Sequence, residues 1–264
     1  MNVVKRSTSE STLKHIYRYL TLPSTLAALL ISNGFWDAPA DETKATPTPL
    51  PDPSLAPFAD LRPESPSPRH HQRAEVLFRL GRFSESVADY NVAARGGEPH
   101  DEDSCWERGL ALYYAGDYAG GAAQFARYHS VGATDVENGL WHFLCLAEAE
   151  GVEKAREALL DYTRMREAPF PALWALYQGE GTVEAVMAAA ESGDGDADGR
   201  GRRLFYAHYY VGKYFEATKD FPRAREHVAK ALAQSLPYFM DDCAREDLRR
   251  LEARVAGETE KKKE

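Results

Sequence analysis

The sequence is short of cysteine and of clustered basic residues. Its three cysteines, Cys105, Cys145 and Cys243, stand singly, without the Cys-x-x-Cys spacing of a zinc or redox motif. This argues against a disulfide framework, and we expect each cysteine to be a small buried residue. The formal net charge of −9 argues against a phosphate-binding surface, so we expect no nucleic-acid partner.

The common enzyme motifs are also absent. The sequence has no Gly-x-x-x-x-Gly-Lys-Ser/Thr, no Gly-x-Gly-x-x-Gly, no His-Glu-x-x-His and no Gly-x-Ser-x-Gly. We therefore expect a protein that is not an enzyme and that has no cofactor. His142 and Cys145 lie three residues apart and would share a helix face, so a cryptic enzyme that uses this pair is an alternative. The favoured interpretation makes His142 and His208 half-buried helix residues.

Two adjacent histidines, His70 and His71, open the folded part of the chain after a proline. A metal role for either histidine would need ligands from elsewhere in the sequence. Two polar side chains at the surface are the simpler interpretation of the pair, so we expect no metal site.

Residues 1–40 have the pattern of a targeting segment. Glu10 is the only acid before residue 37, and an apolar stretch covers residues 20–31. The stretch is shorter than the about 20 residues that cross a bilayer but suits a signal-peptide core. Ala38-Pro39-Ala40 resembles a cleavage site. We expect export to the periplasm or another extracytoplasmic space rather than an organelle, no stable membrane span, and a cytoplasmic location if the segment stays uncleaved.

Proline marks the boundary between an extended segment and a folded domain. Nine of the fifteen prolines lie between residues 39 and 68, mixed with acidic and hydroxyl residues. This composition neither forms helices nor buries a core, so residues 41–68 are predicted to be a disordered tether. A helical domain is expected over residues 69–256, followed by a charged, frayed tail over residues 257–264.

The expected domain repeats one helical hairpin. Gly81 and Gly116 lie 35 residues apart, and each separates two stretches whose apolar residues recur with helical spacing. In the second unit the small residues Gly109 and Gly121 fall where the two helices should touch. The spacing is close to the roughly 34-residue period of tetratricopeptide repeats. The sequence thus predicts an all-α fold built as a solenoid of antiparallel hairpins.

Later units are less regular. A third hairpin turns near Gly151 with a shifted register, and a shortened fourth turns near Gly179. A flexible Asp/Gly loop is predicted over residues 193–199. The last clear hairpin turns at Asp220. We therefore expect about four to five units, of which the third and fourth are degenerate.

This order of units resembles the NlpI-type tetratricopeptide proteins of bacteria. The resemblance covers roughly residues 70–250 and rests on three segments, residues 108–116, 140–144 and 209–215. It implies a non-catalytic adaptor of the cell envelope that brings proteases or wall-modifying enzymes to their targets. The chain departs from that family because it has no cysteine near the leader for lipid attachment and has a long proline-rich tether.

In such a solenoid the first helix of each hairpin lines a concave face that binds a protein or peptide. Tyrosine, tryptophan and arginine side chains suit peptide capture because they bury large areas and keep a polar group. The residues that we expect to line this groove are His71, Glu75, Phe78, Arg79, Asp103, Trp106, Tyr113, Tyr114, Tyr206, Tyr209 and Lys213. Packing between neighbouring repeats is the competing interpretation for the aromatic residues.

Two further alternatives stay open. The protein would serve as an accessory subunit of a protease or hydrolase complex, or it would form a homodimer. The homodimer is suggested by the helix expected over residues 240–255, which has Leu248, Leu251 and Val255 on one face. Capping of the solenoid end is the simpler explanation for this apolar face.

Overall fold

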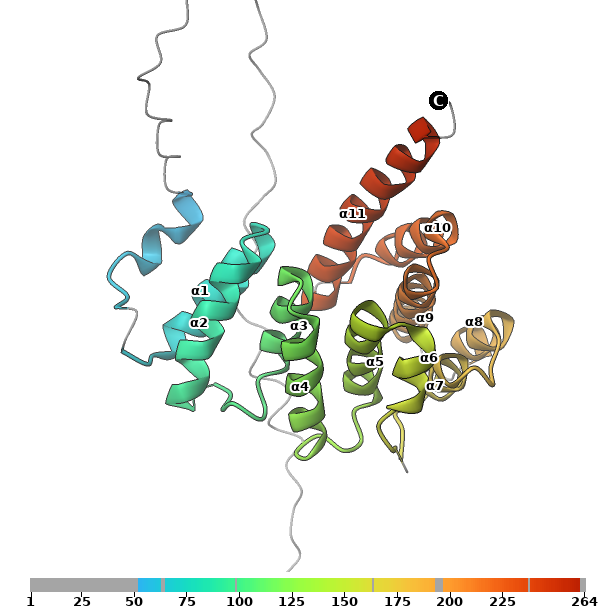
Figure 1. Cartoon of the computed structure of the whole chain (residues 1–264), viewed down its shortest axis with the longest axis horizontal. Coiled ribbons are helices and arrows are strands. Elements are labelled where there is room, and N and C mark those ends of the chain that lie inside the picture. Colours follow the sequence, from blue (N-terminus) through green and yellow to red (C-terminus); the bar gives the residue numbers. More distant parts are fainter. Residues whose placement is uncertain are drawn as a thin grey trace, which may run out of the picture. The chain divides into compact units, whose positions relative to one another are not determined.

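The protein is all-helical throughout the part described by the computed structural model, which comprises residues 52–62, 65–97, 99–162, 164–192, 197–236 and 238–261. These residues form eleven α-helices and one 3-10 helix, and no strand (Figure 1). Most helices that follow one another in the sequence pack against one another. The predicted all-α class is confirmed. The predicted leader, residues 1–40, lies outside the described residues.

The first two hairpins form where the glycine turns predicted them. Helices α1 (Pro68–Arg79) and α2 (Phe83–Gly96) form the first, and α3 (Trp106–Ala115) and α4 (Tyr118–His129) form the second. The small residues fit the expected close contacts, because a Cβ on Gly109 would lie 2.7 Å from the ring of Phe125. A Cβ on Gly121 would lie 2.8 Å from Sγ of Cys145 on the next helix.

The middle helices are shorter, except for the buried α5. Helix α5 (Val136–Glu150) is followed by the six-residue α6 (Val152–Glu157), and then by α7 (Phe170–Gln178) and α8 (Val183–Ser192). The long helix α9 (Ala197–Ala217) pairs with α10 (Phe221–Leu232), and α11 (Phe239–Lys261) ends the described chain.

Four of the hairpin turns close with the same pair of backbone hydrogen bonds. In the first turn, the amide of Arg82 donates to the carbonyl of Leu77 at 2.9 Å, and the amide of Gly81 donates to Phe78 at 2.9 Å. Equivalent donors close the others, namely Asp117 with Gly116, Glu180 with Gly179, and Asp220 with Lys219. This arrangement satisfies carbonyls at the helix end and requires one left-handed residue. Lys219 adopts that conformation, with φ of 65°, where the other turns have glycine.

Part of the predicted tether is ordered structure. Pro53–Phe58 form the 3-10 helix η2, and α1 begins at Pro68, with the hydroxyl of Ser67 as its N-cap. Arg69 donates two hydrogen bonds to the carboxylate of Asp60, at 2.6 and 2.8 Å. The expectation of disorder is therefore wrong over residues 52–62, because polar contacts to α1 hold this segment without an apolar core of its own.

Two other boundaries differ from those expected. Helix α9 begins at Ala197, so Asp198 and Gly199 of the predicted loop are helical. Helix α11 continues to Lys261, so the predicted tail is helical up to that residue. Across the described residues, none of the helices combines the length and the apolar character that a membrane crossing requires.

Gly212 marks the closest approach of α9 and α10, and replacing it by alanine should destabilise the fold. The added Cβ would lie 2.7 Å from Cγ2 of Val228 and 3.1 Å from the carbonyl oxygen of Ala224. We expect the free energy of unfolding to fall by about 1 to 3 kcal/mol, because the two helices must separate. Urea denaturation of the purified variant measures this change.

Gly257 is the matched control. It lies in α11, and nothing comes within 4 Å of a Cβ added there. Its replacement by alanine should leave stability unchanged or raise it by up to about 1 kcal/mol, because alanine has the higher helix propensity. A Gly212→Ala protein as stable as the Gly257→Ala protein would contradict the close packing of α9 on α10.

Candidate functional site

Several of the residues predicted to line the groove come together on one face, and α11 covers that face. We call it the α11 face and define it by Phe78, Trp106, Tyr114, Tyr209 and Lys213, which lie on α1, α3 and α9. Four of these five side chains are buried, and Trp106 is half-buried. Figure 1 shows α11 beginning next to α3 and then running beside α10.

Aromatic contacts seat the start of α11. The ring of Phe239 lies 4.8 Å from the ring of Phe78 and 5.9 Å from that of Trp106, centroid to centroid. The hydroxyl of Tyr114 donates a hydrogen bond of 3.2 Å to the carbonyl of Cys243. Successive turns of α11 thus contact aromatic residues of α1 and α3.

A buried cation anchors the middle of α11. The ammonium of Lys213 lies 3.0 Å from Oδ1 of Asp247 on α11 and 2.7 Å from Oε2 of Glu216 on its own helix. The hydroxyl of Tyr209 donates to Oδ2 of Asp247 at 2.9 Å. All three charged side chains are buried, so the pairing is not screened by water.

Electrostatics keep this cation charged. Burial alone would lower the pKa of Lys213, but the carboxylates of Asp247 and Glu216 raise it well above its usual value. The ring of Tyr113, whose centroid is 4.7 Å from Nζ, and the ring of Trp141, at 5.5 Å, add cation–π contacts. Burial raises the pKa of Asp247 to about 6, which leaves this carboxylate ionised at neutral pH.

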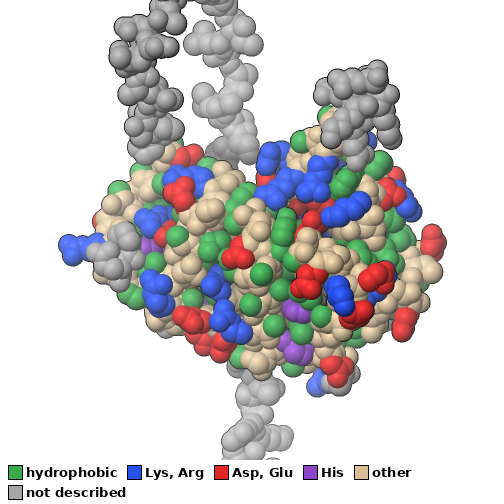
Figure 2. All heavy atoms as spheres, viewed as in Figure 1, with side chains coloured by type: hydrophobic (Ala, Val, Ile, Leu, Met, Phe, Trp, Pro, Cys, Tyr) green, Lys and Arg blue, Asp and Glu red, His purple; other side chains and the backbone are tan. Residues whose placement is uncertain are grey.

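Charged residues border the α11 face. Arg79 on α1 pairs with Asp242 on α11 at 2.7 Å, and Arg250 donates to the carbonyl of Tyr114 at 2.9 Å. A cleft of about 190 Å³ remains between α1 and α11, lined by Phe78, Arg79, Asp242, Arg245, Glu246 and Arg249. Figure 2 shows basic side chains gathered over α11 on this side of the molecule.

The open groove that we expected is therefore wrong for a defined set of residues. Their side chains are buried and meet other parts of the same chain: His71, Phe78, Tyr113, Tyr114, Tyr209 and Lys213. The remaining candidates are half-buried or exposed: Glu75, Arg79, Asp103, Trp106 and Tyr206. Asp103 lies in the loop before α3, and Tyr206 packs on Phe170, away from α11.

Sequence reasoning missed the residues of α11 that complete the site. Phe239, Cys243, Asp247 and Leu251 recur every four residues and so lie on one helix face. The sequence feature that could have identified these residues is Asp247, an aspartate within an otherwise apolar stripe. Leu251 is buried and Leu248 packs against the core, so these two leucines of the suggested dimer surface contact the chain's own helices.

The His142 and Cys145 pair has no catalytic arrangement. Both side chains are buried on α5, and Nδ1 of His142 has no hydrogen-bond partner. Burial raises the pKa of the Cys145 thiol, which disfavours the nucleophilic thiolate. The sulfur packs where Gly121 lets α4 approach α5. These features fit two core residues of a helix.

Asp247→Ala should destabilise the protein strongly. The substitution leaves the Lys213 ammonium buried beside Glu216 alone, and loss of one partner of a buried ion pair costs about 3 to 5 kcal/mol. Urea denaturation followed by circular dichroism measures the loss. Arg249→Ala, which removes an exposed charge two residues away on α11, should change stability by less than about 1 kcal/mol. Equal effects of the two substitutions would contradict the role given to the buried pair.

Acidification should destabilise the protein in part through His142. Burial, together with the charge of His129, lowers the pKa of His142 from 6.5 to about 4 in the folded state. Between these two values the unfolded state binds a proton that the folded state does not, so stability falls as the pH is lowered through this window. Urea midpoints measured across it should depend less on pH in a His142→Gln variant. An unchanged dependence would contradict the assignment.

No protein-family model matches this chain, and a comparison with curated proteins gave no match. The resemblance to NlpI-type proteins therefore rests on the sequence segments given above. The candidate site rests on the contacts between α11 and the helices beneath it.

Proposed function

We propose that this protein is a tetratricopeptide-like scaffold that binds protein partners through an amphipathic helix placed on the α11 face. The contacts that hold α11 on this face support the proposal most directly. Its side chains meet aromatic rings from α1 and α3 and a buried cation from α9, all within one chain. A surface that holds one helix by such contacts is suited to a helix of similar pattern from a partner.

The repeated hairpin turns support the solenoid part of the proposal. Four turns share the same pair of backbone hydrogen bonds, and each lies between two antiparallel helices. Repeats of this kind stack on their neighbours and form a continuous face from their first helices. The short α6 and the nine-residue α7 belong to the third and fourth hairpins, which the sequence predicts to be degenerate.

The contacts of α11 define the partner helix. It would present an aromatic residue where Phe239 lies, a small residue where Cys243 lies and a carboxylate where Asp247 lies, at intervals of four residues. The carboxylate pairs with Lys213, which otherwise keeps Glu216 as its only acidic partner. In this scheme α11 occupies the face until a partner helix displaces it, and the apparent affinity of the partner falls with the occupied fraction.

The role that we propose is non-catalytic. The one pair with a sequence argument for catalysis, His142 and Cys145, is buried in α5. As part of the proposal we place the protein in the cell envelope, as an adaptor for proteases or wall-modifying enzymes, on the strength of its leader pattern and its resemblance to NlpI-type proteins. N-terminal sequencing of the mature protein tests the leader.

The test uses a labelled peptide with the α11 sequence, residues 238–257, and the whole protein. The peptide should bind the Asp247→Ala protein at least about tenfold more tightly than the wild type, because the variant holds its own helix less firmly and keeps Lys213 free to pair. Fluorescence anisotropy measures both affinities. Phe239→Ala removes the aromatic contacts that hold the start of α11. This variant replaces Asp247→Ala in the experiment if the Asp247→Ala protein fails to fold.

Matched controls separate binding of the peptide at the α11 face from non-specific binding. The Arg249→Ala protein keeps all the buried contacts of α11 and should bind the peptide as weakly as the wild type. A peptide carrying Asp247→Ala should bind the weakened proteins less tightly than the native peptide does. Equal binding of the peptide to wild-type and both weakened proteins would exclude exchange of helices on the α11 face.

A further inference from the structure

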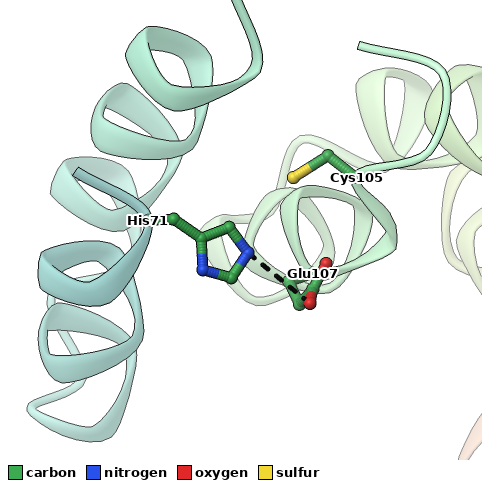
Figure 3. Close-up of side chains that lie close together, drawn as sticks. All are labelled: His71, Cys105 and Glu107. Carbon is green, nitrogen blue, oxygen red and sulfur yellow. Dashed lines mark ion pairs between the residues drawn. The ribbon is translucent and has the colours of Figure 1, made fainter. Parts of the chain in front are cut away.

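A buried group of metal-ligand type lies between the first two hairpins. His71 extends from α1, Cys105 immediately precedes α3, and Glu107 lies in the first turn of α3 (Figure 3). One ligand atom of each residue lies within 4.8 Å of those of the other two, and all three side chains are buried. Residues at the start of the next hairpin thus offer the further ligand atoms that a metal role for His71 would need.

Polar atoms in this group have no hydrogen-bond partner. Nε2 of His71 and Oε2 of Glu107 both lack one, although each residue is only 6% exposed. Nε2 of His71 lies 3.5 Å from Oε1 of Glu107, which is longer than the usual N–H···O hydrogen bond of about 2.9 Å. Buried polar atoms are nearly always satisfied, so the pair points to a further partner between them.

A second histidine lies on the more open side of the group. Nε2 of His100 is 3.5 Å from Oε1 of Glu107, and the His100 side chain is 30% exposed. The rings of His71 and His100 are 5.7 Å apart, centroid to centroid. His100 therefore stands where a fourth ligand could close the group and where an ion could enter from solvent.

We propose that His71, Cys105, Glu107 and His100 form a zinc-binding site. Bond lengths of about 2.0 to 2.3 Å in a tetrahedral zinc site place its ligand atoms about 3.3 to 3.7 Å apart. The two 3.5 Å separations at Glu107 match that range. A thiolate and a carboxylate also balance the two positive charges of Zn²⁺, so the buried site is neutral. The sulfur ligand disfavours Mg²⁺ and Ca²⁺, which take oxygen.

The surroundings of His71 suit a metal ligand. Its other ring nitrogen, Nδ1, faces Oε1 of Glu75, one turn further along α1, at 3.5 Å, which is an ion-pair separation rather than a hydrogen bond of usual length. A carboxylate behind a ligating histidine fixes the ring orientation and the proton position that metal binding needs. The ring of Tyr90 packs edge-on against the imidazole, with centroids 5.0 Å apart. The zinc ion would join α1 to α3 and so fasten the first hairpin to the second.

Cobalt substitution tests the site directly. The untagged, full-length protein is freed of metal by chelation and titrated with Co²⁺ alone. A tetrahedral site with a cysteine ligand should give ligand-field bands and a thiolate-to-cobalt charge-transfer band that saturate at one ion per chain. Zn²⁺ should then displace Co²⁺ and raise the melting temperature of the metal-free protein, because it binds the folded state.

Substitutions assign the ligands. Cys105→Ser should abolish the charge-transfer band and weaken Zn²⁺ binding by more than about tenfold. Cys145→Ser is the matched control, because it alters another buried cysteine outside the group. An alternative metal site is the pair His208 and His227, whose Nδ1 atoms lie 3.1 Å apart. His208→Ala tests this alternative and should leave the charge-transfer band intact.

A Co²⁺ spectrum without a thiolate band in the wild-type protein would overturn the proposal, as would a band that survives in Cys105→Ser. If the Cys105→Ser protein does not fold, a Cys145→Ser/Cys243→Ser protein keeps Cys105 as its remaining cysteine. Retention of the band there supports the site, and its loss contradicts it.

Discussion

The ammonium group of Lys213 is buried away from water, and two carboxylates offset the free-energy cost of burying its charge. Glu216 comes from the same helix, one turn away, whereas Asp247 comes from α11. A buried ammonium without enough opposite charge is strongly unfavourable, so the position of α11 is tied to the position of this cation. Hydrophobic packing alone would let α11 slide along or rotate on the helices beneath it. The pairing of Lys213 with Asp247, held further by the hydroxyl of Tyr209, selects one register.

The aromatic residues around this charge have two roles. Tyr113, Tyr114, Tyr209 and Trp141 bury large ring surfaces, and their polar groups or ring faces turn toward Lys213, Asp247 or the backbone of α11. A residue with an apolar ring and one polar atom is equally suited to a core and to an interface. In this protein these residues belong to the core beneath α11, and in the proposed scaffold they would form the binding surface for a partner helix that replaces α11.

The α11 face and the proposed zinc site are neighbours, because Trp106 of the α11 face lies between Cys105 and Glu107 in the sequence. The α11 face involves α1, α3 and α9 around Lys213, whereas the proposed zinc ligands join the beginnings of α1 and α3. A metal there would fix how the first hairpin stands on the second and so hold Phe78 and Trp106 in place for Phe239. The scaffold proposal does not depend on the metal, because the contacts of α11 are made by other side chains.

The sequence alone predicted the all-helical class and the positions of the glycine turns. These depend on local effects: apolar residues at helical spacing, Gly81 and Gly116 in left-handed turns, and Gly109 and Gly121 at close helix contacts. It also placed the residues of the α11 face on the correct helices. The tertiary structure added that α11 covers this face, that η2 is ordered beside α1, and that Cys105 and Glu107 lie close to His71. Those outcomes depend on contacts between residues far apart in the chain, such as Lys213 with Asp247 and Arg79 with Asp242, and helical periodicity contains no information about which distant faces meet.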